Sequence, residues 1–316
     1  MSSRGEPASR GISALNRDPS PARDDKSLTE IPRKLGMTAI PIGLIMATIA
    51  VVFPAFQHGF EVWSTTEEFS YGFLILPISV AVIWFRRHAV LDAIGRGATS
   101  GLLILVPSLL TMLVAERIGI HALAGIAVSP LLVGAAVYLW GWSAGRVLAF
   151  PFGFLIFGLG VFRGLLDTVG FALQSITAVG AGAAAQVIGL PVVRDGLVLS
   201  SETFAFIVAE PCSGMSSLVS LLALAALWTY AARGSRTGRA MVLLSVAPLT
   251  ILANSARVTL VLVVAHVFGQ DAAVGFFHSA SSLVLFGIAL SGLLLLSRLV
   301  GIHAFAFAVA QPRSAA

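Results

Sequence analysis

The stretch Ala209-Glu210-Pro211-Cys212-Ser213-Gly214-Met215-Ser216-Ser217 leads directly into an apolar run, LVSLLALAALWTYA, at 218–231. Several such runs follow one another along the chain, of which 57% is hydrophobic and 11% charged. Soluble domains carry about 25% charged residues. A helix needs about 20 apolar residues to cross a bilayer core, and lipid tolerates only helices and closed barrels. The sequence therefore predicts an all-α polytopic membrane protein.

We expect about eight transmembrane helices. A helix of small residues, Leu165–Gly189, stands apart from them because Asp167, Gln174 and Gln186 suit an interfacial or groove-lining helix better than a lipid-exposed span. Short β-like pieces around Asp195-Gly196 then predict a small extracytoplasmic hairpin just before Cys212. The expected spans are 38–56, 69–85, 101–115, 121–141, 147–161, 213–231, 240–268 and 281–300.

The charges of the loops predict the orientation. With the amino terminus inside, the outer loops carry three arginines and nine acidic residues. The inner loops carry one acid, Asp92, and a set of arginines: Arg86, Arg87, Arg96, Arg146, Arg233, Arg236, Arg239, Arg298 and Arg313. This asymmetry is the positive-inside pattern. It also explains the basic charge without nucleic-acid binding. We expect residues 1–36 to form a disordered cytoplasmic tail, 37–305 the membrane domain and 306–316 a short tail.

Cys212 is the only cysteine of the chain and the first candidate site residue. It falls near the start of a predicted helix, where free amide groups and the helix dipole lower the pKa of a thiol. A thiolate can attack a carbonyl. A lone cysteine in an apolar protein is more often a packing residue, but Glu210, Ser213 and Gly214 make this position polar. One cysteine forms no internal disulfide, and no metal-binding cluster stands out.

Arg257 and His278 are the other candidates. Arg257 lies inside an apolar run, where a charge costs at least about 2.5 kcal/mol and usually faces the bundle interior. Asn254, one turn earlier, lies on the same face and could hold the guanidinium. Arg257 would stabilise an oxyanion or bind an anionic substrate group; the alternative is an ion pair with Glu210. His278 precedes the last span on the outer side, where it could exchange protons with a thiol, or be merely solvated.

Together these residues resemble the exosortase/archaeosortase family. The resemblance rests on Glu210-Pro211-Cys212-Ser213-Gly214, on Asn254-x-x-Arg257 and on His278 before the final helix. It extends to Phe69-Ser70-Tyr71-Gly72-Phe73-Leu74 and Gly189-Leu190-Pro191-Val192. The family consists of polytopic membrane cysteine transpeptidases. The resemblance implies that Cys212 is the nucleophile, Arg257 the stabiliser and His278 the acid/base, with no cofactor and no metal.

The implied partners are exported proteins with a carboxy-terminal sorting signal made of a short motif, a spanning helix and a basic end. An amine or glycan acceptor would receive the new carboxyl terminus. The chain would then work in the cell inner membrane with its active site facing the periplasm or exterior. Two alternatives stay open: a transporter or channel component that uses Arg257 as an anion site, and a non-catalytic assembly factor for export or exopolysaccharide.

Overall fold

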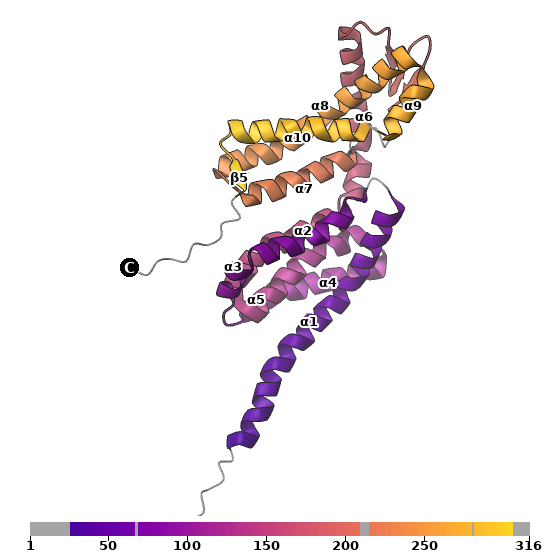
Figure 1. Ribbon diagram of the computed structural model, residues 1–316. Helices are drawn as coiled ribbons and strands as arrows, with labels where there is room; N and C mark the ends of the chain where they lie inside the picture. Colours follow the sequence, from indigo (N-terminus) through magenta and orange to yellow (C-terminus); the bar gives the residue numbers. More distant parts are fainter. Residues whose placement is uncertain (1–25, 67–68, 209–214, 280, 306–316) are drawn as a thin grey trace, which may run out of the picture. The chain divides into compact units, whose positions relative to one another are not determined.

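The computed structural model describes residues 26–66, 69–208, 215–279 and 281–305. The chain divides into two units, Met1–Leu44 and Ile45–Ala316. Helix α1 (Lys26–Thr65) begins in the first unit, earlier than the predicted start at Thr38, and all packing described below lies within the second. The further helices of Figure 1 are α2 Gly72–Phe85, α3 Arg87–Ala93, α4 Leu102–Ile118, α5 His121–Phe154, α6 Arg163–Val187, α7 Met215–Ala231, α8 Arg236–Phe268, α9 Gln270–Ser279 and α10 Ser281–Leu299.

Helix α5 reverses direction at Gly141. This residue has φ +85° and ψ 171°, a backbone conformation that glycine adopts without a side-chain clash. Ser129 Oγ donates a hydrogen bond to the carbonyl of Phe152 at 2.8 Å, which joins positions on opposite sides of the turn. A Cβ atom at Gly125 would lie 2.8 Å from the carbonyl oxygen of Leu159. The segments 121–141 and 147–161, predicted as separate spans, thus run antiparallel on either side of Gly141.

Helix α8 is the centre of the carboxy-terminal half. It contacts α6, α7, α9 and α10, and Figure 1 shows α7, α8 and α10 side by side. Their facing side chains form one apolar cluster, which includes Leu221 of α7, Val246 of α8 and Leu285 of α10. Burial of such side chains is worth about 1.5–3 kcal/mol each relative to water. In a bilayer, where lipid is equally apolar, close packing rather than the hydrophobic effect holds the three helices together.

Helix α6 approaches α8 closely because its facing residues are small. Ala178 and Ala181 are fully buried between the helices. A Cβ atom at Gly180 would lie 2.6 Å from Oγ of Ser255 on α8. Part of the small residues that set this helix apart in the sequence, among them Ala178, Gly180 and Ala181, thus form its contact face with α8.

The predicted hairpin is part of a three-stranded antiparallel sheet that follows α6, with β1 Val193–Asp195, β2 Val198–Ser200 and β3 Ala205–Ile207 in the order β1-β2-β3. Gly196, with φ +59°, occupies the turn between β1 and β2. Leu199 of β2 is fully buried in a cluster that includes Leu262 of α8 and Ala273 of α9. The sheet therefore packs where α8 ends and α9 begins.

Arginine residues gather at the other end of the helices. Arg86, at the break between α2 and α3, donates from Nη1 to the hydroxyl of Tyr230 at the end of α7. The ring of Tyr230 stacks on Phe150 in the second arm of α5. Strands β4 (Ala232–Arg233) and β5 (His303–Phe305) pair next to the start of α8. The loops predicted to be cytoplasmic thus share one end of the unit.

Four helices of the described residues are long and apolar enough to cross a membrane, or up to five if the pair α2 and α3, bent by 66°, counts as one span. Two shorter apolar helices, Ser217–Ala231 and Leu283–Leu299, lie within α7 and α10. Length and composition therefore do not confirm eight spans. Helix α6 is not among the candidates in the described residues, and its interfacial placement stays a prediction.

Two local expectations were wrong. The first span was expected to end at residue 56 and to be followed by a loop with Glu61, but Glu61 lies on α1, which continues to Thr65. His278, expected in a loop before the last span, lies in the last turn of α9. Helix α1 continues through polar residues, whereas α9 is a separate helix that begins after Gly269, whose φ of +89° ends α8.

Candidate functional site

Arg257 lies in the interior of the helical unit. Its side chain is 5% exposed, and its Nε donates a hydrogen bond to Oγ of Ser281 at 3.1 Å. A buried guanidinium is tolerated only where polar partners replace water. Helix α8 ends at Phe268, as expected, so Arg257 lies about 16 Å from this end along the helix. Arg257 is thus a buried, hydrogen-bonded charge within a predicted span.

Asn254 is the second polar residue of this face of α8. It is fully buried, and its Nδ2 donates to Oγ1 of Thr177 on α6 at 3.1 Å. Because residues three apart lie on neighbouring turns of one helix face, Asn254 and Arg257 form a short polar row inside an apolar bundle. Gln174, one turn before Thr177 on α6, is also buried. The row therefore joins α6, α8 and α10.

The bond to Ser281 brings the predicted histidine segment to Arg257. Ser281 is the first residue of α10, and His278 lies three residues earlier, in the last turn of α9. Since Ser281 Oγ is 3.1 Å from Arg257 Nε, the first residue of α10 lies against the guanidinium. Of the predicted site residues, Arg257 is thus bonded to a residue that follows His278 by three positions in the chain.

Cys212, Glu210, Ser213 and Gly214 lie outside the described residues, so their predicted roles stay predictions. The described segments on either side of this gap pack against α8. Val208 is buried in the same cluster as Val258, the neighbour of Arg257. Met215 begins α7, which packs on α8.

Ser281 and Thr177 are the polar partners that sequence reasoning missed. The hydropathy pattern marks Ser281 only as the start of the last span, and Thr177 as one small residue of a small-residue helix. The sequence did contain a signal for Thr177: Gln174 and Thr177 are two polar residues three positions apart, so they lie on one face of a helix. No signal in the sequence pointed from Ser281 to Arg257, which are 24 positions apart.

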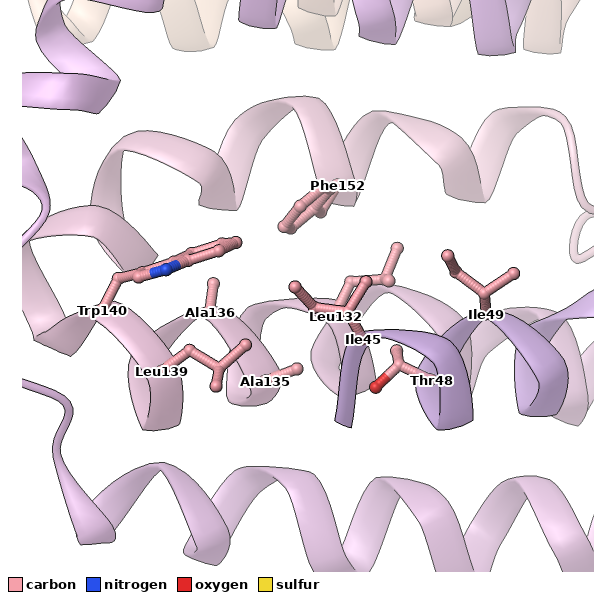
Figure 2. A pocket seen from close by; sticks show the side chains of 9 residues that line it. All are labelled: Ile45, Thr48, Ile49, Leu132, Ala135, Ala136, Leu139, Trp140 and Phe152. Carbon is pink, nitrogen blue, oxygen red and sulfur yellow. The ribbon is translucent and has the colours of Figure 1, made fainter. Parts of the chain in front are cut away.

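A histidine pair and an apolar pocket lie elsewhere in the unit. His58 of α1 and His121 of α5 stack on each other with ring centroids 3.9 Å apart. A slot of about 140 Å³ lies between α1 and the two arms of α5. Figure 2 shows Leu132 and Trp140 facing Phe152 across it. Its lining is apolar apart from Thr48 and carries no acid, base or nucleophile. Among the described residues no cluster of histidine, cysteine and carboxylate side chains could hold a metal ion.

The sequence model of the transmembrane exosortase family (Exosortase_EpsH) matches residues 63–295. The chain belongs to the transmembrane exosortase family. The match runs from Trp63 near the end of α1 to Leu295 in α10, so this exosortase holds its polar row and the segments around it within the family region. The comparisons with curated proteins and with solved structures find no match.

Proposed function

We propose that this exosortase is an integral-membrane cysteine transpeptidase. It cleaves the carboxy-terminal sorting signals of exported proteins at the outer face of the inner membrane and transfers the new carboxyl terminus to an acceptor. The observation that carries this proposal is the buried bond between Arg257 and Ser281, which holds a cationic group against the first residue of α10, three positions after His278. The family match supports the same reaction class.

In the first half of the reaction, the Cys212 thiolate attacks the carbonyl carbon of the scissile peptide bond. The developing oxyanion is stabilised by the Arg257 guanidinium, since a charged donor in a site shielded from water stabilises such charge strongly. His278, having accepted the thiol proton, gives a proton to the leaving amine as the C–N bond breaks. The products are a thioester on Cys212 and the released helical signal.

In the second half, an amine or glycan acceptor, or water, attacks the thioester. His278 accepts the proton of the attacking group, and the thiolate leaves. The supporting residues act on the nucleophile and on the cation: Glu210, Ser213 and Gly214 keep the thiolate segment polar, and Asn254 holds the face of α8 that carries Arg257. No cofactor or metal takes part.

We infer eight spans with the amino-terminal segment inside. The arms of α5 count separately because the chain reverses at Gly141. Helices α7 and α10, of 17 and 19 residues, reach about 26–28 Å at 1.5 Å per residue, close to the roughly 30 Å of a bilayer core. The count is then α1, α2 with α3, α4, two arms of α5, α7, α8 and α10. The end with the arginines faces the cytoplasm, and the sheet faces out.

The test is to co-express the chain with an exported protein that ends in a motif, a spanning helix and a basic tail, and to follow the size of this protein. Wild type should shorten it; Cys212→Ala and Cys212→Ser should not, while both remain in the membrane at wild-type levels. Mass analysis of the new carboxyl end separates transfer from hydrolysis.

Shortening by Cys212→Ala would overturn the proposal. That result would favour the transport alternative, in which Arg257 is an anion site and the thiol is dispensable. A non-catalytic assembly factor predicts a further difference: a thiol-reactive probe would then label Cys212 no faster than an ordinary exposed cysteine.

A further inference from the structure

Two serines of α10, Ser281 and Ser297, are fully buried, but their hydroxyls do different things. Ser297 Oγ donates to the carbonyl of Leu293 in its own helix at 2.8 Å. Ser281 Oγ accepts from Arg257 Nε of another helix at 3.1 Å. The first contact is local to one turn, whereas the second ties two helices together through a charged group.

The bond to Nε restrains the guanidinium near its root. Nε lies where the side chain joins the planar group, so an acceptor there fixes one in-plane N–H direction and restricts rotation about the Cδ–Nε bond. Planar, directional recognition of oxygen atoms is the property in which arginine differs from lysine. Fixing the plane before the substrate binds is the form of preorganisation that stabilises developing charge.

The position of Ser281 adds a second constraint. It begins α10 directly after the α9 segment that ends at Ser279, and His278 stands three residues before it. A hydrogen bond at this place therefore ties the start of α10 to the helix that carries Arg257, three positions after His278 in the chain. The Nδ2 of Asn254, one turn before Arg257, donates toward α6 instead.

We propose that Ser281 is a positioning residue for the reaction. It orients the Arg257 guanidinium and holds the start of α10, which follows the His278 segment, against α8. This inference rests on the proposed function. Ser281 touches no reacting atom itself; its effect passes through Arg257, so it appears in the rate of the chemical step rather than in substrate binding.

The experiment compares Ser281→Ala, Ser281→Thr and the matched control Ser297→Ala in the full-length chain in membranes. Processing is followed as a rate at saturating substrate and as a KM, and thermal unfolding is measured for each purified variant. A hydrogen bond to a charged group corresponds to about a tenfold to hundredfold effect. We expect this loss of rate for Ser281→Ala with KM little changed, recovery of most of the rate by Ser281→Thr, and a wild-type rate for Ser297→Ala.

The inference is overturned if Ser281→Ala processes substrate at the wild-type rate. It is equally overturned if Ser297→Ala slows the reaction as much as Ser281→Ala at the same loss of thermal stability, or if Ser281→Thr restores stability without restoring the rate. Cys212→Ala is run beside them. Activity in that variant would remove the proposed function and this inference together, whereas an inactive Cys212→Ala with any of the three results above removes the inference alone.

Discussion

Asn254 on α8 donates a hydrogen bond from Nδ2 to Oγ1 of Thr177 on α6, and both side chains are fully buried. The bond gives the small-residue helix a role that its composition alone does not show. Glycine and alanine let α6 approach α8, and the threonine then fixes which turn of α6 faces the polar row. Helix α6, expected to be an interfacial or groove-lining helix, thus packs against the candidate site and contributes a hydrogen-bond partner to it.

Replacing Thr177 with valine keeps the shape of the side chain and removes the hydroxyl. We expect the free energy of unfolding to fall by about 1–3 kcal/mol, because the buried amide of Asn254 loses this acceptor. Thr177→Ser should keep most of the stability. The control is Thr250→Val on α8, a buried threonine whose hydroxyl bonds Val246 in its own helix. Equal losses for the two valine variants in thermal unfolding would contradict a role for the interhelical bond.

Arg257→Lys keeps the charge but lacks the planar fork. Under the proposed function we expect processing to slow by about tenfold or more, since lysine cannot reproduce a directional pair of donors. Arg239→Lys is the control, because Arg239 lies on the same helix and its Nη2 bonds the carbonyl of Ala232 at the opposite end. The measurement is the processing rate at equal membrane abundance. If Arg257→Lys were as active as the Arg239→Lys control, a simple anion site would be favoured.

The antiparallel arms of α5 predict a contrast between two glycines. Gly125→Ala should destabilise the protein by about 1–3 kcal/mol, because the added carbon meets the backbone oxygen of Leu159. Gly153→Ala, where no atom lies within 4 Å of the added carbon, should be neutral or stabilising by up to about 1 kcal/mol through helix propensity. Thermal unfolding in detergent compares the two variants. A larger loss of stability for Gly153→Ala than for Gly125→Ala would argue against the antiparallel arms of α5.

Single cysteines in a Cys212→Ala chain test the topology. Ser143, exposed beside the turn at Gly141, should when replaced by cysteine react with a membrane-impermeant maleimide only from the cytoplasmic side. Ile120, exposed before the first arm of α5, should when replaced in the same way react from the outside. If a cysteine at position 143 were labelled in intact cells as fast as one at position 120, the two arms would not cross the membrane as separate spans.

Much of this fold is predictable because a bilayer simplifies the problem. Long apolar runs must become helices in lipid, so the ends of α7 at Ala231 and α8 at Phe268 follow from hydropathy. The break between 121–141 and 147–161 follows from the end of an apolar run and from Arg146, and the turn at Gly196 follows from the turn chemistry of an Asp-Gly pair. The extension of α1 to Thr65 and helix α9 were not predictable in this way, because polar helices at a membrane surface carry no apolar pattern that separates them from loops.

The amino-acid sequence by itself determined the membrane class, the expected orientation of the loops and the family, because these depend on composition, on the placement of arginines and on local motifs. It also singled out Arg257, since a charge within an apolar run is visible without a structure. Only the tertiary structure decided which groups receive that charge and its neighbour: Ser281 for Arg257 and Thr177 for Asn254. Hydroxyls are common in membrane helices, and what makes these two important is their position across a helix contact, which the packing of small residues creates and a linear pattern does not record.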